Sequence, residues 1–466
     1  MEAERPRTRR GALWHTSLFT HIPRVRRRAL IGVRSWAAHP RTPCPMWTRA
    51  CRVAILSGVV TAVALPAVAQ VDQQRAQDYF KDVQAVCERE GKRLWGMSMC
   101  GPMVIADLRT QTIATSQPAP EGPRPRLLGI VNAPVEWGGV TWAAYMWDTL
   151  VNASPRHARE VLLHELFHAV VQAKLGLAAQ GPLPEHLDAM DGRYWLRLEW
   201  RALARALRES GAQRSAAVRD ALAFRQARRM LHTAAAETER AIEITEGLAA
   251  YTGTAAAAAS GDDAVAGALD LLTSGETEES FVRTFAYVSG PAYGLLLDAS
   301  SPGWRQRIRN TDDYAALLAS ALTVQPTTDA AASAVRYGGA DVRAAEEQRE
   351  RQRQERIAEL RRQFVDGPVF LLRGGGNGMS NSMGAVVIPD IGTVFFGPYR
   401  HHADSGTLEA EKGVLLESNG SVRRVPAPVR RDDTTLAGDG WTFTAKPGWV
   451  IREGSRRGDY EVVRQP

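Results

Sequence analysis

One pair of histidines in the sequence has the spacing of a metal site. His164, Glu165 and His168 form the pattern His-Glu-x-x-His within SPRHAREVLLHELFHAVVQAKLG, residues 154–176. On a helix, residues four apart lie on one face about one turn apart, so both imidazoles can share a tetrahedral ion. Glu165 projects beside them, where it can take a proton from activated water and pass it to a leaving amine. We predict two zinc ligands, His164 and His168, and one general base, Glu165.

The segment around this motif is typical of a helix with clear ends. Ser154 suits the N-cap, Pro155 the first helical position and Gly176 the C-terminal stop. Apolar residues surround the motif on nearly every side, which predicts a buried helix. Buried histidines and a glutamate cost free energy unless something compensates them, and a zinc ion would. The alternative is an amphipathic helix whose two histidines are satisfied by ordinary hydrogen bonds.

A third ligand must come from elsewhere, because the residues after His168 read AVVQAK and contain no histidine. The segment TERAIEITEGLAAYTG, residues 238–253, offers two glutamates. On a helix, Glu246 has small apolar neighbours and should face inward, whereas Glu243 has more polar ones. We therefore expect Glu246 to be the ligand, with Gly247 allowing its helix to approach the first one closely. The alternative for Glu246 is an ion pair with a buried arginine.

These two segments together resemble a known group of enzymes. HELFH followed downstream by EGLAAY is similar to the gluzincin branch of zinc metallopeptidases, over about residues 139–298. The resemblance implies that His164, His168 and Glu246 bind Zn²⁺ and that Glu165 is the general base. Tyr287-x-x-Gly290 is similar to a signature of gluzincin aminopeptidases, in which the tyrosine hydroxyl stabilises an oxyanion.

Tyr287 is therefore a predicted catalytic residue, and Tyr293 is the second candidate for that role. A buried tyrosine with a purely structural role is the alternative. The resemblance also implies that GVTWAAYMWDTLV, residues 139–151, contains the strand at the edge of the cleft that pairs with an extended substrate. Its aromatic residues are expected to belong to the core.

The sequence departs from the gluzincin pattern in two respects. Seventy-eight positions separate His168 from Glu246, and two predicted helices between residues 185 and 231 fill this gap. We expect this insertion to cap or narrow the cleft. Ala250 stands where several gluzincins have an aspartate that orients a histidine ligand, so the orientation of the histidines is left without an explanation.

Other residues of metal-binding types are expected to have structural roles. The cluster in PEHLDAMDG is interpreted as the polar start of a helix; it comprises His186, Asp188 and Asp191. His401 and His402 are adjacent on a predicted strand and would point to opposite faces, so they are not expected to share an ion.

The predicted fold class is α+β. A zincin-like domain, mainly helical around the metal site, is expected over residues 70–335, followed by a charged linker helix over 336–364 and a small β domain over 365–466. Within the first domain, a helix is predicted over 70–93 and extended runs over 101–117 and 127–151. Further helices are predicted over 155–175, 185–207, 214–231, 234–258 and 278–297. Nothing in the sequence indicates the role of the β domain.

The N-terminal region resembles an export signal preceded by an unrelated stretch. Residues 46–69 combine Arg49 and Arg52 with an apolar run over 53–67 and small residues before Gln70, as in a signal peptide. Residues 1–45 are arginine-rich, and we interpret them as a mis-annotated upstream extension, with translation starting at Met46. The alternative is a genuine arginine-rich leader.

Composition and charge limit the remaining possibilities. With 44% hydrophobic and 23% charged residues, the chain is neither disordered nor fibrous. Of the 58 basic and 51 acidic residues, residues 1–69 hold 12 arginines and two glutamates, so 46 basic and 49 acidic residues remain from Gln70 onward. This net charge of −3 gives no reason to expect a nucleic-acid partner. No segment after the signal is apolar enough for a membrane span.

The sequence thus predicts a zinc metallopeptidase exported to the periplasm or secreted, acting on a peptide or protein substrate. In such a compartment Cys87 and Cys100 are expected to form a disulfide, the alternative being two buried thiols. Two other functions stay open. One is a non-catalytic envelope protein with a structural metal or none, whose β domain binds a partner. The other is a zinc hydrolase of a non-peptide amide.

Overall fold

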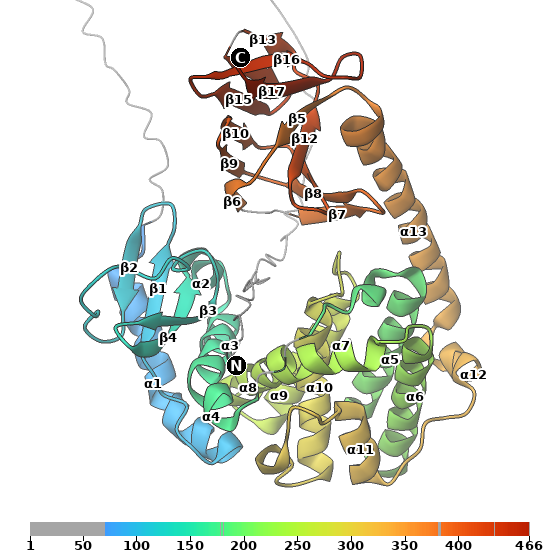
Figure 1. Cartoon of the computed structure of the whole chain (residues 1–466). Coiled ribbons are helices and arrows are strands. Elements are labelled where there is room, and N and C mark those ends of the chain that lie inside the picture. The colour runs from blue at the N-terminus through green and yellow to red at the C-terminus, as the bar shows by residue number, and fades with distance from the viewer. Residues whose placement is uncertain (1–69, 178, 180, 381–383, 433, 466) are drawn as a thin grey trace, which may run out of the picture. The chain divides into compact units, whose positions relative to one another are not determined.

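The computed structural model describes residues 70–465 apart from 178, 180, 381–383 and 433 (Figure 1). The protein is a mixed α+β structure, as predicted. It divides into two compact units, one ending at Gly339 and the other beginning at Ala340. The predicted upstream extension and signal peptide, residues 1–69, lie outside the described residues.

The first unit opens with a helix and a small sheet. Four strands form this sheet in the order β2-β1-β4-β3, with β1 and β4 parallel and the two outer strands antiparallel to their neighbours. Val104, Val135 and Trp142 belong to its buried core. The elements are α1 (Gln73–Trp95), β1 (Met103–Asp107), β2 (Thr112–Thr115), β3 (Ala133–Trp137) and β4 (Val140–Met146).

The strand predicted to face the substrate is not at an edge of this sheet. β4 pairs with β1 on one side and with β3 on the other, so its backbone has no free side. The prediction was wrong because the hairpin partner β3 takes the outer position. The aromatic side chains of β4 are buried in the core, as expected. The extended run ends at Met146 and continues as the short helix α2 (Trp147–Val151). Residues 127–130 form turns instead of a strand.

The helix that carries the histidines spans Pro155–Leu175, as predicted. It consists of α3 (Pro155–Leu166), a π-helical segment η1 (Phe167–Gln172) and α4 (Ala173–Leu175). Ser154 caps its first turn by accepting a hydrogen bond from the backbone N–H of His157, and Gly176 ends it with a left-handed φ of 63°.

The remaining helices of the first unit follow this one. The two helices predicted in the insertion are present and form a hairpin. The helix over 261–275 was not predicted, and the one predicted from 278 begins at Thr284. The remaining helical elements of the first unit are η2 (Glu185–Asp188), α5 (Met190–Arg208), α6 (Gly211–Met230), α7 (Ala235–Ile242), η3 (Glu243–Gly247), α8 (Leu248–Ala257), α9 (Gly261–Gly275), α10 (Thr284–Ser300), η4 (Arg305–Arg307), α11 (Tyr314–Leu322), α12 (Ala330–Ala334) and η5 (Val335–Tyr337).

The second unit contains all but the first residue of the charged helix α13 (Gly339–Arg361), which ends in a π-helical turn, η6 (Arg362–Asp366). Side chains 351–356 of α13 are exposed. Leu360 and Phe364, by contrast, are buried against Ile388, Val394 and Leu415. The predicted linker helix is therefore anchored to the β-rich part at its C-terminal end.

Two sheets make up the rest of this unit. Their orders are β13-β14-β15-β10-β9-β6 and β16-β17-β5-β12-β11-β8-β7. Phe370 of one sheet and Leu408 and Phe443 of the other meet in a common core, so the sheets pack face to face. The strands are β5 (Val369–Arg373), β6 (Gly376–Ser380), β7 (Gly384–Ile388), β8 (Gly392–Phe396), β9 (Tyr399–Ala403), β10 (Gly406–Ala410), β11 (Val414–Glu417), β12 (Val422–Pro426), β13 (Arg430–Arg431), β14 (Thr435–Gly438), β15 (Trp441–Ala445), β16 (Trp449–Glu453) and β17 (Tyr460–Arg464).

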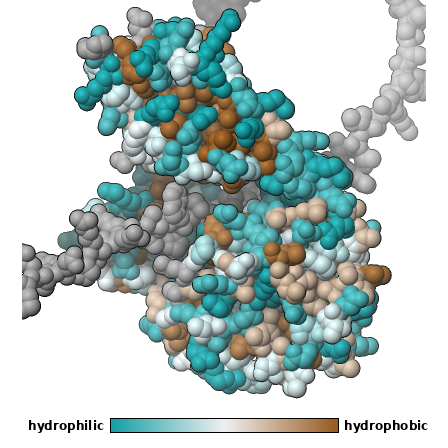
Figure 2. All heavy atoms as spheres, turned by 45° about the vertical axis from the view of Figure 1, so that its right-hand side comes forward, coloured by the Kyte–Doolittle hydropathy of each residue, from teal (hydrophilic) through white to brown (hydrophobic). Residues whose placement is uncertain are grey.

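The surface of the second unit carries hydrophobic side chains. Figure 2 shows brown, hydrophobic residues gathered on its visible face. Val387 of β7 and Val429 are among the exposed apolar residues of this unit. His401 is buried and His402 exposed, as expected for neighbours on a strand. Among the described helices of the whole chain, none combines the length and the apolar character that a bilayer crossing requires.

Candidate metal centre

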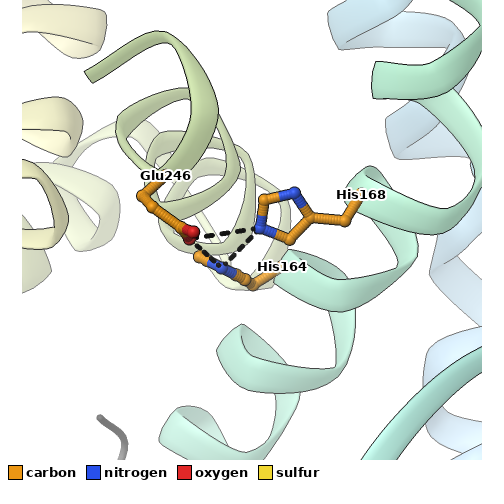
Figure 3. Close-up of side chains that lie close together, drawn as sticks. All are labelled: His164, His168 and Glu246. Carbon is orange, nitrogen blue, oxygen red and sulfur yellow. Dashed lines mark hydrogen bonds and ion pairs between the residues drawn. The ribbon is translucent and has the colours of Figure 1, made fainter. Parts of the chain in front are cut away.

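Three predicted ligand side chains converge in the first unit. His164 from α3 and His168 from η1 point toward the carboxylate of Glu246, which comes from η3 (Figure 3). The two histidine Nε2 atoms are 3.0 Å apart, and Oε2 of Glu246 lies 3.5 Å from that of His164 and 3.3 Å from that of His168. This arrangement brings together residues 78 positions apart in the sequence.

The donor atoms fit a small tetrahedral ion. Zinc binds histidine nitrogen and carboxylate oxygen at about 2.0–2.2 Å, so neighbouring ligand atoms around it would be separated by about 3.3 Å. The three observed separations, 3.0, 3.3 and 3.5 Å, lie around this value. Two imidazoles and one carboxylate suit zinc better than magnesium or calcium, which prefer oxygen ligands. Within the described part of the chain, no fourth His, Cys, Asp or Glu joins this group.

Both ligand segments depart locally from α-helical winding. His168 lies in η1 and Glu246 in η3, and both segments are π-helical. A π turn inserts one extra residue and turns the following side chains around the axis, and such turns are frequent at functional sites. The i, i+4 rule therefore placed the histidines on one face correctly, although the second one lies where the winding changes.

Burial and the mutual proximity of the side chains set the charges in this group. Burial lowers the pKa of His164 to about 4, so its ring is neutral and can offer a lone pair. Burial acts to lower the pKa of His168 as well, but the carboxylates of Glu246 and Glu165 outweigh it and raise the value to about 9. Burial acts to raise the pKa of Glu246, yet His168 and His164 hold it well below its usual range. Glu246 is thus an ionised carboxylate in a buried site.

Glu165 lies beside the three ligands without joining them. Its Oε1 is 4.0 Å from Nε2 of His164, and the side chain is buried. Burial, together with the negative charge of Glu246, raises its pKa to about 8. A buried carboxyl with a raised pKa next to a cation site is suited to exchanging protons near neutral pH.

Tyr287 of α10 reaches the centre from a third helix. Its hydroxyl donates a hydrogen bond of 2.7 Å to Oε2 of Glu246, and its ring stacks on that of His164 at 5.4 Å between centroids. Burial and the negative charge of Glu246 raise its pKa well above the usual value, so the hydroxyl keeps its proton. Tyr293, the second candidate, lies elsewhere: its hydroxyl donates to Glu199 at 2.8 Å.

We expected Glu243 to lie on a more polar, more exposed face than Glu246, and this prediction was wrong. Glu243 is 1% exposed, against 8% for Glu246. The two glutamates differ in their partners, because Arg225 of α6 donates to both carboxylate oxygens of Glu243 at 2.9 and 2.5 Å. The ion pair with a buried arginine, considered as the alternative for Glu246, is thus made by Glu243. A sequence-based estimate of burial could not separate them, since the arginine comes from the insertion.

This ion pair belongs to a larger buried network that joins the insertion to the ligand segment. Arg225 and Arg228 both donate to Glu199 of α5, and Arg228 also pairs with Glu239 of α7. These carboxylates and guanidinium groups have almost no exposed surface. Buried ion pairs therefore join the hairpin of α5 and α6 to η3.

The close approach predicted for Gly247 occurs with a different helix. A Cβ at Gly247 would face Tyr314 and the backbone of Ala286 on α10, not the histidine helix. The histidine helix is approached through Gly253 of α8, where a Cβ would lie 2.6 Å from the carbonyl oxygen of Glu160. The prediction was wrong because Gly247 lies on the opposite side of its helix, facing α10.

The other predicted polar residues have structural contacts. His186 contacts Glu239 at 2.9 Å, and Asp188 accepts hydrogen bonds from the backbone of Phe281 and the hydroxyl of Ser280. Asp191 lies in the first turn of α5. They do not reach the metal centre, in agreement with their interpretation as polar residues at a helix start.

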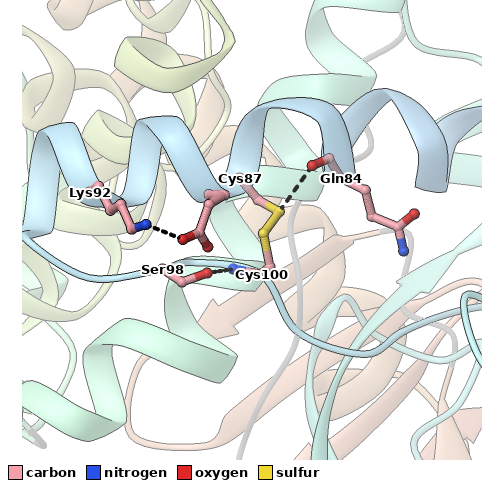
Figure 4. Close-up of a disulfide and its surroundings, with 6 residues drawn as sticks. Gln84, Cys87, Lys92, Ser98 and Cys100 are labelled. Carbon is pink, nitrogen blue, oxygen red and sulfur yellow. Dashed lines mark hydrogen bonds and ion pairs between the residues drawn. A yellow bond between two sulfur atoms is a disulfide. The ribbon is translucent and has the colours of Figure 1, made fainter.

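A disulfide and helix α1 support the other side of the centre. Cys87 of α1 is bonded to Cys100, with the Cα atoms 5.1 Å apart, so the predicted disulfide is confirmed (Figure 4). Further along α1, the indole of Trp95 donates to the hydroxyl of Thr252 at 3.1 Å, and Arg93 donates to the carbonyl of Ala255. Both acceptors lie on α8, which continues the segment that carries Glu246.

One residue near the centre was missed by the sequence analysis. Gln172, the last residue of η1, accepts a hydrogen bond from Nδ1 of His168 at 2.6 Å. A signal for it was present, since Gln172 follows His168 by four positions and therefore lies on the same helical face.

We compared the chain with known protein families, curated proteins and solved structures. No family model, curated protein or solved structure matches this chain.

Proposed function

We propose that this protein is a zinc-dependent metallopeptidase with a zincin-like domain of the gluzincin type. The observation that carries the proposal is the convergence of two imidazoles and one carboxylate at separations of 3.0–3.5 Å, with a further buried carboxylate beside them. A structural zinc site is normally closed by four protein ligands, whereas a catalytic one keeps a position open. Three donors in this group therefore favour catalysis.

The roles of the side chains follow from their positions. His164, His168 and Glu246 would hold the ion, which when bound supplies Lewis-acid chemistry toward a carbonyl group and toward water. Glu165 is placed to take the proton of the attacking water and to deliver it to the leaving amine. Tyr287 keeps its proton and donates it to Glu246 in this structure; to stabilise the developing oxyanion, its hydroxyl would have to turn from Glu246 to that oxygen.

The substrate is proposed to be a peptide or protein bound along β3. This strand is the edge of the four-stranded sheet next to the centre, and it packs against η1, which carries His168. An edge strand has one row of free backbone groups that can pair with an extended chain. β3 thus takes the place that the sequence assigned to β4.

Export fits the same proposal. A signal peptide over residues 46–69 remains the expectation from the sequence, and a disulfide is typical of proteins in oxidising compartments. We therefore propose that the enzyme acts in the periplasm or outside the cell.

Metal analysis of purified protein tests the proposal most directly. We expect one zinc per chain in the parent, loss of zinc in His164→Ala and Glu246→Ala, and retention of zinc in Glu165→Gln with loss of peptide hydrolysis. Glu165→Gln is the matched variant, because it is isosteric and removes only the ionisable oxygen beside the ligands.

Two results would contradict the proposal. A parent protein without zinc, or Glu246→Ala with its full zinc content, would mean that the ligand set is wrong. Zinc that is bound by the parent but supports no hydrolysis of a broad peptide library would favour the non-catalytic envelope protein. Hydrolysis of non-peptide amides alone would favour the third function.

A further inference from the structure

Gln172 connects the two segments that carry the metal ligands. Its side chain is 6% exposed and lies at the end of η1. On one side, its Oε1 is 2.6 Å from Nδ1 of His168. On the other, its Nε2 lies 2.9 Å from the carbonyl oxygen of Thr245 and 3.4 Å from that of Ile244. Both of these carbonyls belong to η3, one and two residues before Glu246.

These contacts fix the direction of every hydrogen bond. A carbonyl oxygen can only accept, so the end of the Gln172 amide that faces Thr245 and Ile244 must be the NH₂ group. The end that faces His168 is then the amide oxygen, which also only accepts. Nδ1 of His168 must consequently carry a proton, whether or not Nε2 also carries one.

The position of this proton matters for metal binding. To bind a metal, His168 must give up any proton on Nε2, the atom that faces His164 and Glu246; because the remaining proton is held on Nδ1, the lone pair is then on Nε2. Metal-binding histidines generally donate their other ring N–H to an acceptor that holds the ring in place. In this protein the acceptor comes from the same helix, one turn further on.

The NH₂ group of the Gln172 amide has a different effect. By donating to the backbone of Thr245 and Ile244, it holds η3 against η1 directly beside Glu246. One buried side chain thus contacts both segments directly beside the 3.3 Å separation between His168 Nε2 and Glu246 Oε2.

We propose that Gln172 is a positioning residue of the metal centre, which selects the tautomer of His168 and sets the spacing between η1 and η3. The role rests on the proposed zinc site, in which Ala250 leaves no carboxylate on α8 to orient a histidine. Gln172 contacts one proposed ligand, His168, and the backbone next to another, and not the reacting atoms.

Zinc affinity measured by competition with a chelator of known affinity tests this role on the full chain. Gln172→Met keeps approximately the length and volume of the side chain but can neither accept from His168 nor donate to η3. We expect it to bind zinc about 10- to 100-fold more weakly than the parent. Gln172→Glu keeps an acceptor for His168, and we expect it to recover part of this loss.

A control variant separates the effect from the general loss of an amide that donates to the backbone. Gln77 of α1 also donates to a backbone carbonyl, that of Thr115, but lies away from the metal centre. Gln77→Ala should bind zinc as tightly as the parent. The absorption spectrum of the Co²⁺-loaded proteins gives a second readout, in which Gln172→Met should differ from the parent and Gln77→Ala should not.

The outcomes distinguish this proposal from the one on which it rests. If parent and Gln172→Met bind zinc with equal affinity and show the same Co²⁺ spectrum, Gln172 has no positioning role, and the zinc site stands. If the parent itself binds no zinc, both proposals fall. Partial recovery in Gln172→Glu would support hydrogen bonding to His168, and no recovery together with loss in Gln77→Ala would indicate a purely structural effect.

Discussion

Gly290 of α10 lies directly against Gly247, the residue that follows the proposed ligand Glu246. A Cβ at Gly290 would lie 2.6 Å from the Cα of Gly247 and closer still to its carbonyl oxygen. The two backbones are therefore in contact at this point. One turn earlier on α10, Tyr287 can reach the carboxylate of Glu246 because of this close approach. The pair of glycines explains why Tyr-x-x-Gly and Glu-Gly occur together in this chain.

Substitution of Gly290 by alanine should separate these helices. Overpacking of a buried contact typically costs about 1–3 kcal/mol, and we expect a loss of this size in the free energy of unfolding measured with urea. Gly261→Ala is the control, because a Cβ at Gly261 has no heavy atom within 4 Å. Equal stability of Gly290→Ala and the parent would show that the helices can move apart without cost.

The two tyrosines of α10 should respond differently to loss of the hydroxyl. On the proposed mechanism, Tyr287→Phe keeps its zinc, while kcat for peptide hydrolysis falls by about 10²- to 10³-fold, as for removal of an oxyanion donor. Tyr293→Phe loses a hydrogen bond to the buried Glu199 and should mainly lower stability. Steady-state kinetics and zinc analysis check this. A fall of only a few-fold in Tyr287→Phe would argue against the oxyanion role.

Glu243 and Glu246 lie three positions apart, and their substitutions should affect zinc binding differently. Glu243→Gln removes one charge of a buried pair with Arg225, which typically costs about 3–5 kcal/mol, so the metal-free protein should be strongly destabilised. Glu246→Gln also removes a buried charge, one that faces His164 and His168, so the metal-free variant should lose stability too; it differs from Glu243→Gln in that it should bind zinc weakly. Loss of zinc in both variants at equal stability would mean that both carboxylates bind the ion.

Removal of the disulfide should weaken the support of α8 by α1. Cys87 and Cys100 close a loop with a sequence separation of 13 residues, for which the entropy model gives about 3 kcal/mol. We expect a double substitution to alanine to lower the free energy of unfolding by this amount in oxidising buffer. Addition of reductant should bring the parent to the level of the variant. Insensitivity of the parent to reductant under unfolding conditions would contradict the prediction.

Asp220 of α6 should make part of the stability pH-dependent. Burial acts to raise its pKa, but hydrogen bonds from Arg336, Tyr337 and Ser333 outweigh this effect, and the pKa lies below the ordinary 3.8. A lowered pKa means that the stabilisation is fully present above the ordinary value and is lost as the pH falls through the lowered one. Asp220→Asn should therefore be less stable than the parent at neutral pH.

The difference between Asp220→Asn and the parent should begin to narrow near pH 3.8 and shrink further below it. Urea unfolding of both proteins across this range measures it. A difference that stays constant down to the acid limit would mean that the contacts of Asp220 do not depend on its charge.

The local features of this protein could be predicted from its sequence. The helix over residues 155–175, its caps, the shared face of His164 and His168 and the disulfide partners follow from spacing, because they involve residues close together in the chain. The choice of Glu246 agrees with its position beside the histidines, although the reasoning on the exposure of Glu243 was wrong.

Contacts between side chains that are far apart in the sequence could be assigned only from the tertiary structure. The arginine that pairs with Glu243 comes from the insertion, and the strand at the sheet edge is β3 because its hairpin covers β4. The link from Gln172 to the carbonyl of Thr245 depends on the packing of two helical segments, because these residues are 73 positions apart. Periodicity gives the face of a helix, but the neighbour of that face is set by packing of the whole core.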